Sequence, residues 1–502
     1  MKDKFTVLLL SIILMASTTG MAYANPNQKP TPCDLQADMH KLWEDHILWT
    51  RNVVLNIMDE LPGTTEAVNR LLQNQVDIGN AIKTYYGDAA GTQLTVLLHE
   101  HITIAADLLT ALKNNNTPAF NTANAQWINN ANAIAALLSS VNPNWHLTEM
   151  QMMMHEHLTA TAAEALARKI GNYPGDVAAF DEVHRQILAM ADMLAEGIVK
   201  QFPNMFNGCP INQNAKKTTT CDLKSGMYNL WEDHIIWTRN VILNIMDDLP
   251  GTTEAVNRLL QNQVDIGNAV KPYYGNAAGD QLTSLLTEHI TIAATLLTAL
   301  KNDHTAAFNS AYTQWADNAN AVAALLSSVN AAWPLAEMQA MIQEHLTATA
   351  AEAMARKTGD YAGDVSAYDN VHHQILEMAD MLTEGIAKQF PNMFNGCPLT
   401  MAHKENSNPT AHNQFNSEVI LAQNTPNPFY DKTVINYFIP EKVRHAQILI
   451  YNNMGVLIKK LDIKAKGKGS IIFDANQYKK GIYSYSIVAD GQLIHSKKMI
   501  VL

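Results

Sequence analysis

The 502-residue chain has no long hydrophobic run after its first 15 residues, and it contains only four cysteines. Without such a run, no transmembrane segment is expected in the mature protein. No Cys-x-x-Cys pair occurs, so a thiolate zinc site or an attached c-type haem is not expected. Positive charge is also scarce. The formal net charge is −12, which argues against nucleic-acid binding.

Motifs of common catalytic sites are missing as well. The chain has no P-loop, no dinucleotide-binding glycine pattern, no nucleophile elbow and no His-Glu-x-x-His zinc motif. The paired Glu-x-x-His motifs of di-iron bundles are absent too. An enzyme of unknown class is therefore the least supported function.

The N-terminus has the three parts of a signal peptide. Lys2 and Lys4 form a basic start, residues 5–15 are apolar, and Ala22-Tyr23-Ala24 is a cleavage site. The apolar run is too short to span a bilayer. We therefore expect residues 1–24 to be removed on export, and no cysteine follows that would receive a lipid anchor.

Most of the remaining chain is a duplication. Residues 33–209 (repeat 1) recur as residues 221–397 (repeat 2) at a constant offset of 188, with about three quarters of positions identical. Each copy is long enough to be a whole domain. The second copy shows which residues of the first are dispensable.

Each repeat starts and ends with a cysteine. The four cysteines allow three connectivities. Pairing within each repeat, Cys33 with Cys209 and Cys221 with Cys397, is favoured because each copy is expected to have folded alone before duplication. Such bridges would clamp the two ends of each domain.

The pattern between the breaks predicts a mainly α protein. Ala, Leu, Met and Gln dominate, and apolar residues recur at i, i+3, i+4 and i+7. Short connections favour antiparallel neighbours, so we expect two tandem six-helix up-and-down bundles. In repeat 1 the predicted helices are about 34–60, 65–86, 89–113, 118–140, 147–170 and 175–202.

The texture changes after a polar linker at 399–423. Residues 424–502 carry 12 Lys and Arg against 5 Asp and Glu, and short β-branched runs separated by turns predict a small all-β sandwich. This tail resembles the type A C-terminal sorting domain of the type IX secretion system. The resemblance rests on these residues: Pro426-Asn427-Pro428-Phe429, Ile435 to Pro440, Ile448, Tyr451, Asn452, Gly455, Gly481-Ile482-Tyr483-Ser484-Tyr485 and Lys497-Lys498-Met499-Ile500-Val501. It implies export by the type IX machinery to the cell surface or the medium, and the tail is usually removed.

Histidine is the residue type that points to a site. Repeat 1 holds eight histidines, and repeat 2 replaces four of them, His40, His99, His146 and His155. The four that persist lie in the apolar rows of their helices, whereas His99 and His155 lie about 200° away on the solvent side. The persistent residues are His46, His101, His157 and His184, with counterparts His234, His289, His345 and His372.

These histidines allow three interpretations. Facing helices of a bundle build metal sites, so they are candidate ligands of a transition metal or cofactor. Supporting carboxylates would be Glu164 and Asp181, with counterparts Glu352 and Asp369. Alternatively, the histidines satisfy one another and nearby buried polar groups in a structural network, or one acts as a catalytic base without metal.

The helical repeats also faintly resemble an uncharacterised bacterial all-helical family. The shared residues include His46-x-x-Trp49-x-Arg51, the segment from Asn69 to Asp77, and His157-Leu158 with Glu164 to Arg168. No activity follows from this resemblance. The sequence thus predicts a secreted or surface tandem-bundle protein, either binding a metal or cofactor in each bundle or serving as a structural or adhesive module.

Overall fold

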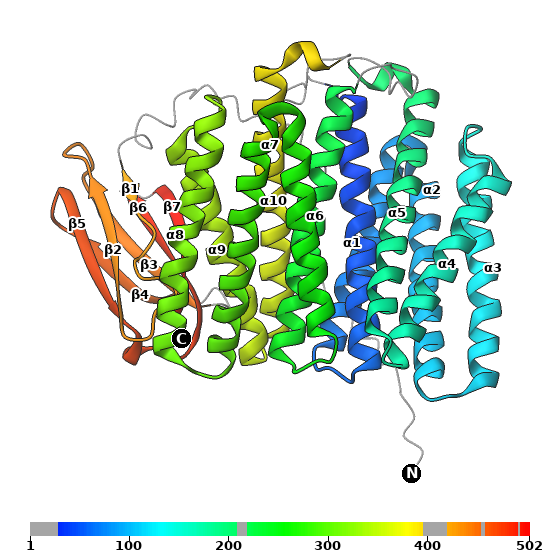
Figure 1. Ribbon diagram of the computed structural model, residues 1–502, viewed down its shortest axis with the longest axis horizontal. Helices are drawn as coiled ribbons and strands as arrows, with labels where there is room; N and C mark the ends of the chain where they lie inside the picture. The colour runs from blue at the N-terminus through cyan, green and yellow to red at the C-terminus, as the bar shows by residue number, and fades with distance from the viewer. Residues whose placement is uncertain (1–28, 208–217, 395–418, 453–456, 490–491, 502) are drawn as a thin grey trace.

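A computed structural model describes residues 29–207, 218–394, 419–452, 457–489 and 492–501. The expected signal peptide, Cys209, Cys397 and most of the predicted linker lie outside these residues. The described chain forms a row, with repeat 1 at one end, repeat 2 in the middle and the β domain at the other end (Figure 1).

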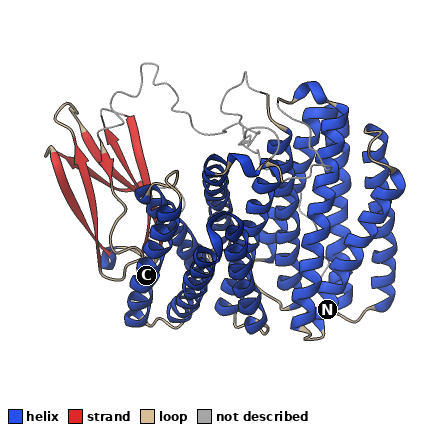
Figure 2. Cartoon of the chain, turned by 45° about the horizontal axis from the view of Figure 1, so that its top comes forward, coloured by secondary structure: helices blue, strands red, loops and turns tan. Residues whose placement is uncertain are grey.

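Each repeat has five long helical elements, the second of which contains two of the six predicted helices. In repeat 1 they are α1 (Pro32–Met58), α2 (Thr64–Lys113), α3 (Thr117–Val141), α4 (Leu147–Lys169) and α5 (Tyr173–Gln201), followed by the 3-10 helix η1 (Pro203–Met205). In repeat 2 they are α6 (Thr220–Met246), α7 (Thr252–Lys301), α8 (Thr305–Val329), α9 (Leu335–Thr358) and α10 (Tyr361–Gln389), followed by η2 (Pro391–Met393). Figure 2 shows the helices packed alongside one another.

The count differs because two predicted segments form the single element α2. Its backbone is non-helical only at Gly87, where φ is 80° and ψ is 170°, a conformation that side chains with a Cβ rarely adopt. The two halves fold back on each other, since a Cβ on Gly91 would lie 2.4 Å from the Gly79 carbonyl oxygen. By length and composition α2 and its counterpart α7 are candidates to cross a membrane, but core helices of bundles pass the same test, so this is weak evidence.

Helix starts follow from local sequence. Thr31 caps α1, and its side chain accepts a hydrogen bond from the Asp34 backbone N–H while Asp34 accepts one from Thr31. Thr219 and Asp222 repeat this capping box on α6. Both central helices therefore begin at equivalent positions, which fixes their register.

The two repeats meet along α1 and α6, which run side by side and in the same direction (Figure 1). Contacts join each position to its counterpart 188 residues later or to that counterpart's neighbour. Arg51 donates to the Asn240 side-chain oxygen at 2.7 Å, and Arg239 donates to that of Asn52 at 3.0 Å. At the helix ends, Leu55 and Leu61 form an apolar cluster with Leu243 and Leu249. The repeats are therefore related by an approximate twofold axis between these helices.

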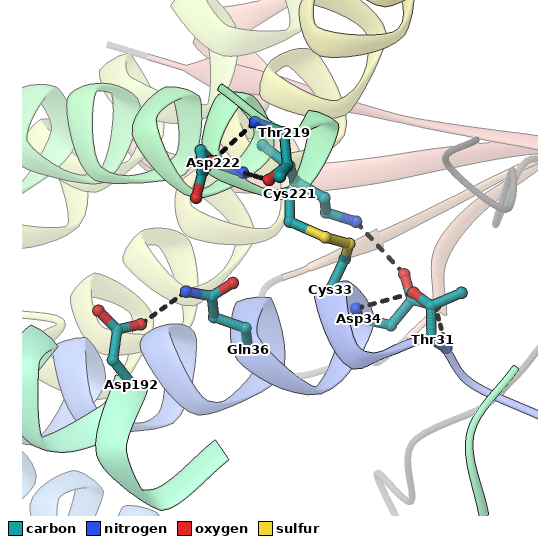
Figure 3. Close-up of a disulfide and its surroundings, with 9 residues drawn as sticks. Thr31, Cys33, Asp34, Gln36, Asp192, Thr219, Cys221 and Asp222 are labelled. Carbon is teal, nitrogen blue, oxygen red and sulfur yellow. Dashed lines mark hydrogen bonds and ion pairs between the residues drawn. A yellow bond between two sulfur atoms is a disulfide. The ribbon is translucent and has the colours of Figure 1, made fainter. Parts of the chain in front are cut away.

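The disulfide prediction was wrong for Cys33 and Cys221. These two residues bond to each other, with Cα atoms 5.1 Å apart (Figure 3). The approximate twofold axis between α1 and α6 explains this pairing. Both cysteines lie in the first turns of α1 and α6, where equivalent positions face each other across the repeats.

The tail is a β-sandwich, as the sequence predicts. Its strands are β1 (Ile420–Leu421), β2 (Lys432–Ile439), β3 (Ala446–Asn452), β4 (Leu457–Ile463), β5 (Gly467–Asp474), β6 (Gly481–Ala489) and β7 (Gln492–Val501), with the 3-10 helix η3 (Ala475–Gln477). All pairings are antiparallel, in sheets of order β1-β2-β5 and β4-β3-β6-β7. The domain rests on repeat 2, where Ile500 joins the helical core and the Tyr430 ring lies 5.8 Å from that of Phe308.

The cross-repeat bridge predicts a specific peptide map. Digestion of the oxidised full chain should release a peptide pair joined through Cys33 and Cys221. Changing Cys33→Ser should lower the free energy of unfolding by up to about 5 kcal/mol, because a loop of 188 residues loses its closure. Urea unfolding of oxidised wild type and variant measures this. A Cys33–Cys209 peptide in place of the expected pair would contradict the cross-repeat bridge.

Candidate functional site

Three of the four persistent histidines gather inside each bundle. His46 on α1, His101 on α2 and His157 on α4 are all buried, and the rings of His46 and His157 lie 5.7 Å apart. The His101 ring lies against Trp127 at 5.2 Å. Repeat 2 shows the same arrangement with His234, His289, His345 and Trp315, at ring distances of 5.7 and 5.2 Å.

A small cavity lies among these rings in repeat 2. Its volume is about 20 Å³, which is room for one water-sized group. No Asp, Glu, Lys or Arg side chain lines it. Its fourteen lining residues are all identical in repeat 1, although about a quarter of aligned positions differ. They are His234, Thr238, Val241, Leu259, His289, Ile290, Ala293, Ala294, Leu296, Leu297, Trp315, His345, Thr349 and Ala350.

Hydrogen bonds orient one ring and leave another unpaired. The Asn130 amide donates to the Leu97 carbonyl at 3.0 Å, so its oxygen accepts from His101 Nδ1 at 2.8 Å. His101 Nε2 therefore keeps a free lone pair. His157 Nδ1 is buried and has no hydrogen-bond partner, and the same holds for His345. Leaving such a nitrogen unpaired costs about 1–3 kcal/mol.

These three histidines are neutral at pH 7. Burial lowers the pKa of His101 to about 4 and that of His157 to about 3. Burial and the two neighbouring imidazoles hold the pKa of His46 well below its usual value. Neutral imidazole is the form that binds metal ions. In the described ranges, however, no group of three or more His, Cys, Asp or Glu side chains has the arrangement of a metal site.

The fourth histidine does not join this cluster. His184 on α5 bonds Glu44 at 2.9 Å and approaches Asp233 of repeat 2 at 3.8 Å. His372 likewise bonds Glu232 at 2.8 Å and Asp45 of repeat 1 at 3.1 Å. Grouping them with the other histidines was wrong, because α5 and α10 turn these faces toward the boundary between the repeats.

The predicted supporting carboxylates serve arginines instead. Glu164 accepts from Arg51 at 2.8 Å, and Glu352 accepts from Arg239 at 2.7 Å, all of them buried. Asp181 and Asp369 are about one third exposed and pair across the boundary with Arg258 and Arg70, each at 2.9 Å. The pairs of Asp181 and Asp369 therefore join the two repeats, whereas those of Glu164 and Glu352 lie within one repeat.

The boundary contains an acidic pair that the sequence did not single out. Glu44 and Glu232 lie at equivalent positions on either side of the axis, both fully buried, and the Oε2 atom of each has no hydrogen-bond partner. Burial, reinforced by the charge of Glu232, raises the pKa of Glu44 to about 8. Burial opposes protonation of His184, but the Glu44 carboxylate prevails and raises the pKa of His184 to about 9. The cluster therefore keeps protons to higher pH than the unfolded chain does.

The available signal for this pair was the run Trp43-Glu44-Asp45-His46, which repeats unchanged as residues 231–234. An amphipathic helix has one solvent-exposed face, and two consecutive acidic residues are normally expected on that face. In the structure every residue from 43 to 56 is buried, because α1 is enclosed by α2, α5 and α6.

Comparison with known proteins decides the identity of the tail. A family model described as a secretion system C-terminal sorting domain matches residues 425–502. The tail is a type IX secretion sorting domain. It directs this helical protein out of the cell, to the surface or the medium, and engages the type IX machinery.

The comparisons do not indicate a family or a fold for the helical repeats. No curated protein matches the chain. One solved structure, Pseudomonas fluorescens alkylpurine DNA glycosylase AlkC bound to DNA containing an abasic site analog, is 10% identical and covers 74% of this chain and 96% of its own. The TM-score is 0.12, far too low to indicate a shared fold.

The neutral histidines predict a loss of stability in acid. Their folded-state pKa values lie below the unfolded value of about 6.5, so stability present above that pH is lost as pH falls toward 4. Changing His157→Leu should flatten this loss between pH 6.5 and 4.5, measured by urea unfolding. The exposed neighbour His155→Leu is the control and should leave the slope as in wild type. Equal slopes in both variants would contradict the buried neutral state.

The acidic pair predicts a second loss in alkali. The folded-state pKa of His184 and of His372 is raised to about 9, so their contribution is complete below about 6.5 and lost as pH rises through 9. Glu44, raised from 4.5 to about 8, acts in the same direction. Unfolding free energy should therefore fall by several kcal/mol between pH 6.5 and 9.5, on the order of the shifts involved.

The matched variants are Glu44→Gln at the axis and Glu182→Gln on the surface of α5. Glu44→Gln removes the carboxylate that raises the His184 pKa, so its alkaline loss should shrink. Glu182→Gln should retain the full loss. If Glu44→Gln keeps the wild-type slope, the axis cluster is not the source of the alkaline transition.

Proposed function

We propose that this exported protein binds one transition-metal ion in the histidine cavity of each bundle. The observation that carries the proposal is an ion-sized cavity bordered by three neutral imidazoles, one of which has an unpaired buried nitrogen. A second metal-binding unit in the same chain follows from the duplication. We also propose that the chain divides into five parts, which are the signal peptide, repeat 1, repeat 2, the linker and the sorting domain.

The donor chemistry supports a transition metal. Imidazole nitrogens suit zinc, copper, iron and nickel, whereas calcium and magnesium sites rely on carboxylates, and none lines the cavity. Asn130 holds His101 in the tautomer with a free Nε2, as hydrogen-bonded partners of metal ligands do. Binding requires the rings of His46 and His157 to turn toward the cavity, which would also give the unpaired nitrogen of His157 a partner.

A structural or adhesive module is the second candidate, favoured by a different observation. Three of the predicted site residues are already engaged in ion pairs within or between the repeats, so their donor atoms do not serve a ligand. They are His184, Glu164 and Asp181. In that case a water molecule occupies each cavity and the duplicated body acts through its surface.

Metal analysis separates these functions. The oxidised full chain is dialysed against zinc, copper or iron and its metal content measured, and binding should approach two ions per chain. The paired variant His101→Ala with His289→Ala should lose the metal. The exposed control His155→Ala should keep it. Wild type without metal above background, and with an unchanged melting temperature on metal addition, would refute the metal proposal.

A further inference from the structure

The two repeats differ most where α1 and α6 first run together. Residues 36–41 read Gln-Ala-Asp-Met-His-Lys, and residues 224–229 read Lys-Ser-Gly-Met-Tyr-Asn. Five of these six positions differ, whereas about a quarter differ across the whole repeat. The difference lies directly after the Cys33–Cys221 bridge (Figure 3). Positions near the axis, where equivalent residues meet, have therefore become unlike.

The unlike residues are complementary in charge. Lys224 Nζ lies 3.1 Å from Asp380 within repeat 2 and 3.7 Å from Asp34 of repeat 1. Asp38 of repeat 1 is half-buried; this burial raises its pKa to about 7, and the charge of Lys224 counteracts that rise. At the position equivalent to Lys224, repeat 1 has Gln36, which donates to Asp192 at 2.7 Å. Repeat 2 thus supplies the cation, and repeat 1 supplies the acid.

Hydrogen bonding is complementary as well. His40 Nδ1 donates to the Asn229 side-chain oxygen across the boundary at 3.1 Å, and Ser225 Oγ lies 3.4 Å from the same nitrogen. His40 Nε2 donates to Asp192 at 2.6 Å. Burial lowers the pKa of His40, but the bond to Asp192 outweighs it and the net shift is upward. Repeat 2 has Tyr228 at the position of His40, so two copies of repeat 1 would not reproduce this arrangement.

We infer that segments 36–41 and 224–229 form a pairing code, through which repeat 1 selects repeat 2 and rejects a second copy of itself. Nearly identical tandem repeats are prone to mispair with other chains. Two repeat 1 surfaces would bring Asp38 against Asp38 without Lys224, and the remaining Lys41 is already paired with Asp45. Two repeat 2 surfaces would place Lys224 against Lys224 with no aspartate at position 226. Unlike pairing avoids both conflicts, which is specificity achieved by rejecting the wrong partner.

Segment exchange in the full chain tests this inference. The first variant gives repeat 2 the repeat 1 segment, with K224Q, S225A, G226D, Y228H and N229K. The matched control adds the reciprocal changes Q36K, A37S, D38G, H40Y and K41N, so that both segments are exchanged and complementarity is restored in reverse. Each chain is refolded under oxidising conditions at high protein concentration. Non-reducing peptide mapping and size-exclusion chromatography then measure which cysteines pair and how many chains associate.

Wild type should remain a single chain with the Cys33–Cys221 bridge. The first variant should show about a tenfold rise in Cys33–Cys33 and Cys221–Cys221 peptides and in disulfide-linked dimers, the change that 1.4 kcal/mol of lost discrimination gives. The reciprocal exchange should restore the wild-type pattern. The inference is overturned if the first variant pairs as wild type does, or if the reciprocal exchange mispairs as much as the first variant.

Discussion

The contact between α1 and α6 is the constraint on which the rest of the helical body depends. These helices begin at matching capping boxes, are joined by Cys33 and Cys221, and meet along an approximate twofold axis. Because α1 is surrounded by α2, α5 and α6, it has no solvent-exposed face over residues 43–56. Every polar side chain in that stretch must therefore find a partner inside the protein or carry an unpaired atom.

Arg51 is a charged side chain of that stretch with partners in both repeats. Arg51 donates to Glu164 and Asp176 of its own repeat and to Asn240 of the other, while its guanidinium lies 4.7 Å from the Phe180 ring. Arg239 repeats this pattern in the second copy. Guanidinium suits the position, since it presents several donors in one plane and stacks on aromatic rings. Removing either arginine would take the hydrogen-bonded counter-charge from a buried glutamate, Glu164 or Glu352. It would also remove a hydrogen bond between the repeats.

The sequence predicted local features well and contacts between distant segments less well. Helical texture, the β-sandwich and the inward direction of His46, His101, His157 and His184 follow from periodicity, which is a property of a few consecutive turns. The disulfide, the partners of His184 and the Glu44–Glu232 pair depend on how one repeat sits against the other. Periodicity does not reveal that arrangement, because it describes one helix at a time and not which face meets the other repeat. The break at Gly87 inside α2 is a local feature as well, and it falls between the predicted helices 65–86 and 89–113.

Adjacent residues of α1 connect the two chemical features of the body. Glu44 faces the axis, Asp45 contacts His372 of the other repeat, and His46 lies in the histidine cluster beside His157, as expected for side chains about 100° apart on a helix. Under the proposed function, a cation beside His46 is separated from the carboxyl pair Glu44 and Glu232 by the width of α1. Its charge favours ionisation of that pair in a region that water does not screen. The equivalent cavity of repeat 2 acts on the same pair through His234, so the two metal sites would share one set of titrating groups and would be coupled through it.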